Sequence, residues 1–198
     1  MSIPHTKNTL GLILRNEIYR DGDCIVTFFT QQEGKYRAMA HGAARIRSRR
    51  LGHLDMGTIS CIEFRESSAA DFMPSITACK NHLSYQKIKL DLSKNSLMLT
   101  LLAAVEKALP LSMPVPGLWS LMKIIFGWLE EKDSINRQEL MYVPLIFEIK
   151  LHTLLGNFPP FSEIQKKPFL TIVRQPLSPL ELGNLTTEVI RLRQAIPL

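Results

Sequence analysis

Six basic side chains and no acidic one lie between Gly34 and Leu54 (GKYRAMAHGAARIRSRRLGHL), and this density is the feature best suited to chemistry. The six are Lys35, Arg37, Arg45, Arg47, Arg49 and Arg50. A guanidinium can bind two oxygens of one phosphate and keeps its charge at physiological pH. The cluster therefore indicates polyanion binding through phosphate contacts. The alternative is a solvated surface loop, since a run of charge is usually just that.

Aromatic side chains beside this basic cluster could stack on nucleic-acid bases. The candidates are Phe28, with its neighbour Phe29, and Tyr36. Successive strand residues point to opposite faces, so we expect either Phe28 or Phe29 to be a platform and the other to be core. The predicted nucleic-acid surface thus combines the six basic residues with Phe28 and Tyr36.

Enzyme and metal motifs are not found in the sequence. It has no G-x-S-x-G, P-loop, H-E-x-x-H or G-x-G-x-x-G pattern. The cysteines Cys24, Cys61 and Cys79 are scattered, which argues against a disulfide framework and against a zinc ribbon. We therefore expect no catalytic residues, no metal and no cofactor, and hold an uncharacterised enzyme as a third hypothesis only.

The bulk composition indicates a folded chain outside the membrane. Of the 198 residues, 45% are hydrophobic and 21% charged, with a net charge of +6, which suits a packed core and acidic partners. No apolar run approaches about 18 residues, and the N-terminus lacks a leader pattern. The sequence predicts no membrane contact, and its scattered cysteines favour reduced thiols in a cytoplasmic protein.

The elements that must position the basic cluster are five short strands. Alternating apolar and β-branched residues separated by turn signals such as Asp21-Gly22-Asp23 favour strands. The expected strands are 10–19, 24–30, 36–41, 58–65 and 72–82. Five strands with turns at this spacing suit a small closed barrel, and the oligonucleotide-binding barrel of this size is the OB-fold.

From residue 86 the apolar period becomes helical. One helix is expected to end at Pro110, a second to follow Pro116, a third to end at Gly156 and a fourth to begin at Ser178. Pro144 is expected either to open or to kink the third helix. A short extended piece is expected at 169–173. The predicted class is α+β, with an N-terminal five-stranded OB-fold barrel at 1–83 and an all-α helical domain at 84–198.

Two separate runs of residues resemble the RecO family of bacterial recombination mediators. The first run is Gly11-x-x-Leu14-Arg15, Tyr19 with Asp23, Ile25-Val26-x-Phe28-Phe29-Thr30, Gly34-Lys35 and Gly42-Ala43-x-Arg45-x-x-Ser48-Arg49. The second, Phe147-Glu148-x-Lys150-Leu151-x-x-Leu154-Leu155-Gly156-x-x-Pro159, resembles that family's central helix. Both occur in the family's order along the chain.

The resemblance implies a non-enzymatic protein that binds single- and double-stranded DNA and anneals complementary strands. It implies that RecR is a partner, that RecA is loaded indirectly, and that the C-terminal tail of single-stranded-DNA-binding protein (SSB) docks in the helical domain. By position, the six basic residues would contact phosphates. Lys123 and Lys150, beside apolar stripes, are candidates for the tail carboxylate.

The chain departs from the family pattern in two places. Leu54 is followed by Asp55-Met56-Gly57 where the family often has Pro-Phe. No cysteine follows Cys79, so we expect a short member without the four-cysteine zinc module that many members carry.

A protein-interaction adaptor of the same fold that has lost DNA binding is the alternative from another class. Arginines of the loop sharing a surface with Lys35 and Arg37 would favour DNA binding. Ion pairs from the loop to Glu63, Glu66 or Asp71 would favour the adaptor.

Overall fold

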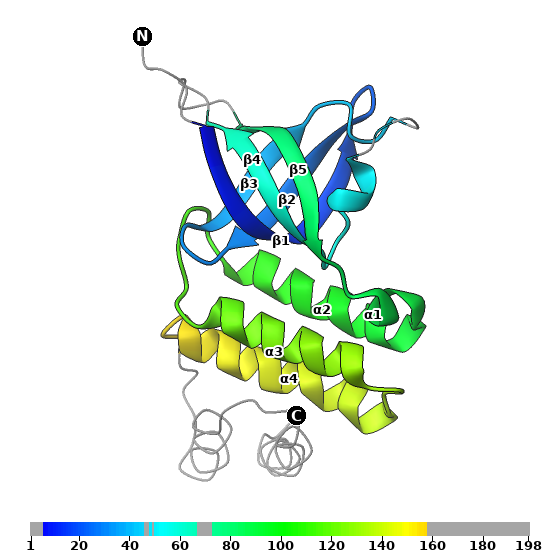
Figure 1. Cartoon of the computed structure of the whole chain (residues 1–198). Coiled ribbons are helices and arrows are strands. Elements are labelled where there is room, and N and C mark those ends of the chain that lie inside the picture. The colour runs from blue at the N-terminus through cyan, green and yellow to red at the C-terminus, as the bar shows by residue number, and fades with distance from the viewer. Residues whose placement is uncertain (1–5, 46–47, 49, 67–72, 158–198) are drawn as a thin grey trace. The chain divides into compact units, whose positions relative to one another are not determined.

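A computed structural model describes residues 6–45, 48, 50–66 and 73–157 of the chain (Figure 1). The chain splits into two compact units, one of residues 1–85 with 102–114 and the other of residues 86–101 with 115–198. The predicted domains, 1–83 and 84–198, differ from these units in that 102–114 groups with the strands. The predicted extended piece at 169–173 and the helix at Ser178 lie outside the described residues.

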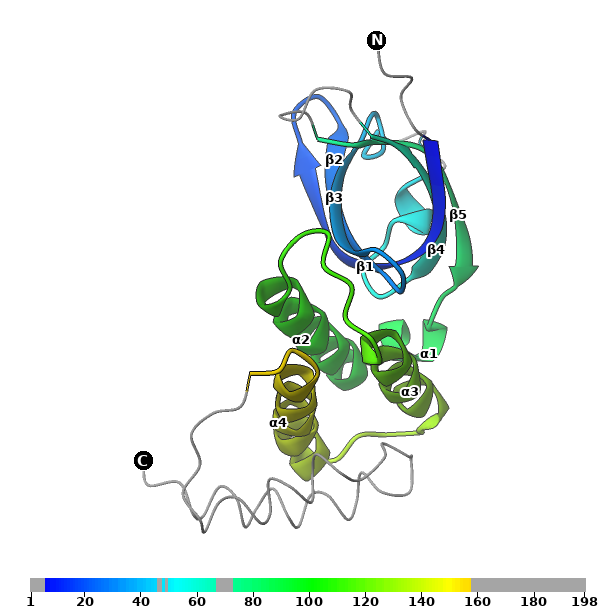
Figure 2. The ribbon, with the colours of Figure 1, turned by 90° about the vertical axis from the view of Figure 1, so that its left-hand side faces the viewer.

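The first unit is built on five strands that close into one barrel. They are β1 (Thr6–Tyr19), β2 (Asp23–Thr30), β3 (Gly34–Ala40), β4 (Ile59–Arg65) and β5 (Ser75–Leu83). The order β1-β2-β3-β5-β4 is closed by pairing of β1 with β4. All pairings are antiparallel except β3 with β5. Figure 2 shows the strands as a ring. The predicted α+β class, with an OB-like sheet followed by helices, is confirmed.

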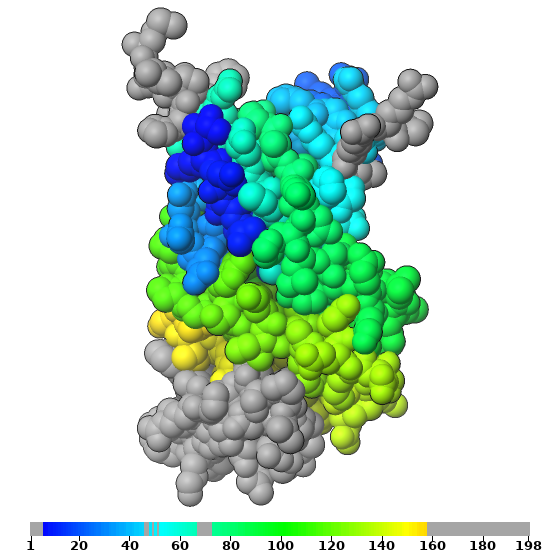
Figure 3. Space-filling view, viewed as in Figure 1, coloured from blue at the N-terminus to red at the C-terminus, as the bar shows by residue number. Residues whose placement is uncertain are grey.

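The barrel interior is filled by inward-facing side chains from every strand. Ile13, Val26, Phe28, Ala38 and Ile62 are all fully buried in this core. They alternate with outward-facing neighbours, as the two-residue period of a strand requires. In the space-filling view β1, β4 and β5 form a continuous surface over the core (Figure 3). The ends of the predicted strands differ from the observed ends by at most four residues.

The outer face of β1, β2 and β3 carries two cross-strand rows. Leu12, Phe29 and Lys35 form one row, and Arg15, Thr27 and Arg37 form the next. A register shift between Ile13 and Arg15 inserts Leu14 as a bulge. Because a bulge re-aims the strand that follows it, Arg15 comes to face outward beside Thr27.

The segment after α2 (Leu92–Ala108) returns to β3. Leu111 bridges to Lys35, and the Ser112 N–H donates to the Lys35 carbonyl at 2.8 Å. Gly34 has φ +82, and a Cβ there would lie 2.7 Å from the Met113 nitrogen and closer still to its carbonyl. Only glycine permits this approach. These contacts explain why 102–114 groups with the strands.

The helices are α1 (Gln86–Leu90), α2 (Leu92–Ala108), α3 (Leu118–Glu131) and α4 (Arg137–Leu154). α2 contributes residues to both units. In the second unit the Glu130 carboxylate accepts from the first free N–H groups of α1, at Lys87 and Ile88. None of the described helices is long and apolar enough to cross a membrane.

Pro144 lies inside α4 and does not open the helix. Asn136 and Glu139 form a reciprocal capping box that starts the helix at Arg137, one turn and more before the proline. Gly156, with φ +74, follows the end of α4 as predicted.

Candidate nucleic-acid interface

A hollow of about 380 Å³ lies on the outer face of the first three strands. Its lining combines cations, acids and two uncharged side chains: Arg15, Glu17, Thr27, Lys35, Arg37, Glu106 and Leu111. All of these belong to the barrel unit. The cations lie on β1 and β3, on either side of β2, and Arg15 and Arg37 are exposed to an anion that enters the hollow.

Glu17 lies between the two arginines of this hollow. Its carboxylate accepts from Arg15 Nη2 at 2.7 Å and stands 3.8 Å from Arg37 Nη2. The two arginine side chains are 51% and 48% exposed, so solvent reaches both. Exposed ion pairs of this kind contribute about 0–1 kcal/mol, so the guanidinium groups can change partner.

Lys35 differs from the prediction that it presents a free surface charge. It is 9% exposed, and its ammonium donates to the Glu106 backbone carbonyl at 2.6 Å. A buried ammonium needs such a partner because an unpaired one carries a large desolvation cost. Lys35 therefore fixes the end of α2 to β3 and lines the hollow without offering a free cation.

The start of the arginine loop is fastened to the turn between β1 and β2. Asp23 accepts from the Gly42 N–H at 2.7 Å and pairs with His41 Nδ1 at 2.9 Å. These contacts, the Gly42 N–H first, hold the pKa of the Asp23 carboxyl below its usual range. The Ala44 N–H also donates to the Gly22 carbonyl at 2.8 Å. Arg45 is thereby held, exposed, beside that turn.

Arg50 lies partly buried against β5. Its Nη2 donates to the Thr77 carbonyl at 3.0 Å, and its N–H donates to Ser48 Oγ at 3.2 Å. This guanidinium already has a backbone acceptor, so part of its hydrogen-bonding capacity is used within the barrel. Arg47 and Arg49 lie outside the described residues.

The acids proposed as loop partners have other contacts. Glu63 accepts from Thr77 Oγ1 at 2.8 Å, and Glu66 pairs with Lys7 at 3.0 Å. Within the described part of the chain no ion pair joins Arg45 or Arg50 to either acid. Asp71 is outside the described residues.

The prediction of aromatic stacking platforms is wrong for Phe28. Phe28 and Phe29 are both 0% exposed, and the Phe28 ring stacks on Tyr36 with centroids 5.7 Å apart. Tyr36 is itself 9% exposed and belongs to the same core. Both faces of β2 are covered, so alternation could not single out one exposed ring.

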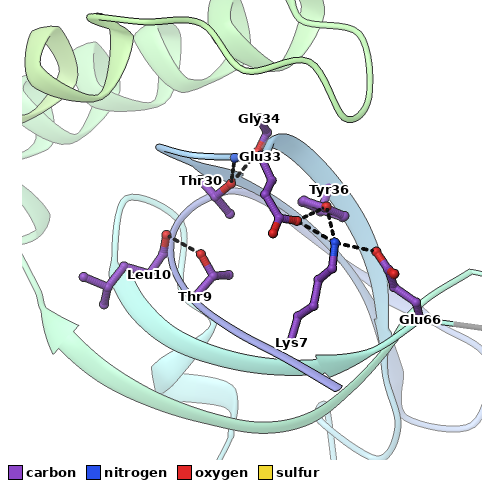
Figure 4. A network of polar contacts seen from close by, with 8 residues as sticks. All are labelled: Lys7, Thr9, Leu10, Thr30, Glu33, Gly34, Tyr36 and Glu66. Atoms are coloured by element: carbon purple, nitrogen blue, oxygen red, sulfur yellow. Dashed lines mark hydrogen bonds and ion pairs between the residues drawn. The ribbon is translucent and has the colours of Figure 1, made fainter. Parts of the chain in front are cut away.

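The Tyr36 hydroxyl belongs to a polar network that joins three strands (Figure 4). Lys7 pairs with Glu33 at 2.8 Å and donates to the Tyr36 oxygen at 3.3 Å, while Tyr36 donates to Glu33. The contact with Glu33 raises the pKa of Lys7, and Lys7 lowers the pKa of Glu33. Burial raises the pKa of Tyr36. The network fastens β1 to the β2–β3 turn and, through Glu66, to the end of β4.

A known family matches the part of the chain that holds the strands, and known relatives match most of the chain. The family described as "Recombination protein O N terminal" matches residues 1–83, the segment that contains all five strands. A relative from Syntrophus aciditrophicus, "DNA repair protein RecO", is 27% identical over 179 residues, covering 90% of this chain and 64% of the relative. Residues 1–83 thus match the RecO N-terminal family, and the chain is similar to RecO proteins over most of its length.

Two further relatives with the same name match the chain over a similar length. "DNA repair protein RecO" of Syntrophobacter fumaroxidans is 26% identical over 155 residues, 78% of this chain and 58% of that protein. Its namesake in Listeria monocytogenes serotype 4b is 25% identical over 153 residues, 77% of this chain and 57% of that protein. The chain thus spans roughly three-fifths of the length of these curated relatives.

The sequence pattern did not single out Arg15 and Glu17 as site residues. Arg15 enters only as part of the family resemblance. The available signal was their spacing of two in one strand, which places both on the same face. Their meeting with Arg37 depends on the bulge at Leu14 and on the β1–β2–β3 register, which no local pattern specifies.

The helical unit holds the two residues predicted to bind the SSB tail. Lys123 is exposed on α3, and Lys150 is partly exposed on α4. Their assignment stays a prediction. Among the described residues no group of three or more His, Cys, Asp or Glu side chains could hold a metal ion.

Proposed function

We propose that this chain is a DNA repair protein that captures DNA on the basic outer face of its barrel. The observation that supports this most directly is the pair Arg15 and Arg37, both about half exposed and opening into one hollow. Arg45, held exposed beside the β1–β2 turn, is proposed for the same DNA-binding set. Arg50, together with Arg47 and Arg49 outside the described residues, is proposed for this set from the sequence. These cations meet phosphates without reading bases.

The mechanism proposed is electrostatic and involves no covalent step. Cations on the barrel neutralise phosphates and release the counterions condensed on the DNA. Two complementary strands held on one protein repel each other less, so annealing is accelerated. The proposed ligands are single- and double-stranded DNA, and the proposed location is the cytoplasm, at the nucleoid.

RecR and the SSB tail are proposed as partners, with RecA loading as the outcome. The names of the relatives support repair, and the family resemblance supports these partners. Lys123 and Lys150 are the groups proposed for the acidic tail. The adaptor alternative gains nothing from the loop, since neither Arg45 nor Arg50 pairs with Glu63 or Glu66 among the described residues.

A salt titration of single-stranded DNA binding, read by fluorescence anisotropy, tests the proposal. Removing one cation that neutralises a phosphate should reduce the slope of log K against log salt by about 0.7. Arg37→Gln should lower the slope by that amount. Lys35→Met is the matched control on the same strand and should leave the slope unchanged, because its ammonium is held by Glu106.

Two results would contradict this assignment. A wild-type protein that does not bind DNA at about 50 mM salt would contradict DNA capture itself. A slope that falls equally in both variants would contradict the distinction between Arg37 and Lys35. A strand-annealing assay with complementary labelled oligonucleotides then tests the finer function, with Arg37→Gln expected to anneal more slowly than Lys35→Met.

A further inference from the structure

The Glu17 carboxylate occupies the place that an anionic ligand would take in the outer-face hollow. Two guanidinium groups from different strands converge on it, Arg15 at 2.7 Å and Arg37 at 3.8 Å. A carboxylate and a phosphodiester both present two oxygens and one negative charge to a guanidinium. The hollow is therefore an anion site filled from within the chain.

We propose that Arg15 and Arg37 form a phosphodiester subsite and that Glu17 is its internal competitor, displaced when DNA binds. This proposal rests on the proposed function and adds the residues that set its affinity. Glu17 is 37% exposed, so its side chain can swing into solvent without breaking a buried contact. The pairs it makes are exposed and hence weak, so a phosphate can replace it.

Three further residues of the lining are held in place. Lys35 is held by the Glu106 carbonyl at 2.6 Å, and Leu111 is held through its bridge to Lys35. Thr27 is buried between the two arginines in the cross-strand row. Displacing Glu17 therefore requires one side chain to move while the walls stay in place.

Glu106, the second acid of the hollow, also repels a bound phosphate. With Glu106 also in the lining, three cations face two acids, so the site carries little net charge. A single phosphate group is therefore attracted only weakly to the hollow. A DNA strand that contacts several cations at once can offset the repulsion from Glu17. The competitor thus makes binding depend on a polyanion rather than on any single phosphate group.

Replacing Glu17 with glutamine tests the competition. Removing a like charge a few ångströms from a bound phosphate should strengthen binding on the order of fivefold at low salt. The salt slope should steepen by up to about 0.7, because no displaced carboxylate remains to recruit a cation. The probe is fluorescein-labelled oligothymidine at about 50–200 mM NaCl, with folding checked by circular dichroism.

Glu63→Gln is the matched control. It removes the same charge from the outer side of another strand, β4, and glutamine can still accept from Thr77. Its affinity should stay within about twofold of wild type, since distant surface charges are screened. The gain from Glu17→Gln should also vanish when Arg15 and Arg37 are both glutamine.

The outcomes separate this inference from the function on which it rests. If wild type binds DNA and Glu17→Gln binds equally or more weakly, Glu17 only positions the arginines and the competition is refuted. A gain of the same size in Glu63→Gln would likewise refute it. If neither wild type nor Glu17→Gln binds DNA, the proposed function fails and the subsite fails with it.

Discussion

Replacing Gly34 with alanine should destabilise the barrel far more than the same change at Gly42. Both glycines have positive φ, +82 at Gly34 and +66 at Gly42. An L-residue in this region costs about 1–2 kcal/mol through contact of its Cβ with the backbone. That cost is common to both sites, so any difference between them reports the surroundings of the new methyl group.

The surroundings differ sharply. At Gly42 the nearest atom to a Cβ is Arg45 Cδ at 3.6 Å, an ordinary contact with a flexible side chain. At Gly34 the nearest atoms are all backbone atoms of Met113, including its nitrogen at 2.7 Å. The chain at 111–113 must therefore move, which breaks the bond from the Ser112 N–H to the Lys35 carbonyl.

The magnitudes follow from these changes. Gly42→Ala should cost about 1 kcal/mol of stability, the backbone strain alone. Gly34→Ala adds the loss of a hydrogen bond of about 1 kcal/mol and a backbone shift of similar cost, for a total of about 3 kcal/mol. The shift should also widen the hollow, because Leu111 is one of its walls.

Native-state hydrogen exchange of the β2 and β3 amides is the suitable assay. Exchange reports the free energy of opening in the barrel itself, whereas both tryptophans, Trp119 and Trp128, lie in the helical unit. Equal reductions of protection in the two variants would refute the argument, since they would mean that the approach of Met113 costs nothing.

The remaining predictions concern the polar contacts around the barrel. Lys7 lowers the pKa of Glu33, so Glu33 stabilises the fold above its unfolded pKa of about 4.3, and this is lost as pH falls through the folded value. Thermal melts from about pH 6 to 3 should therefore decline less steeply for Glu33→Gln than for wild type, and parallel declines would contradict the linkage. Asp23→Ala should speed exchange of the Gly42 amide and weaken DNA binding about twofold to threefold by loosening the loop, whereas unchanged exchange would show that Asp23 does not fasten it.

The barrel was predictable because its signals are local. The Asp21-Gly22-Asp23 turn and the alternation in β4 lie within single segments, and the five strands appear where these patterns predict them. Turn chemistry and a two-residue period act over a few residues and survive in any tertiary context that buries one face.

The site was less predictable because exposure is not a local property. Lys35 and Phe29 lie in one cross-strand row on the outer face, yet both are buried. Lys35 is buried because residues 102–114, far along the chain, return to the strand. The sequence therefore indicates where positive charge lies along the chain, but not which of those charges remain available to a ligand.

The distribution of available charge bears on how tightly such a protein should hold DNA. Of the described cations near the hollow and loop, Arg15, Arg37 and Arg45 are exposed, while Lys35 and Arg50 donate to backbone carbonyls. Phosphate contacts by these three arginines would contribute about 2 to the slope on single strands. Annealing needs a surface that releases one strand when its complement arrives, because a strand held by many contacts would block pairing. Competition from Glu17 weakens the contacts of Arg15 and Arg37 with phosphate, and this favours capture that stays reversible at cellular salt.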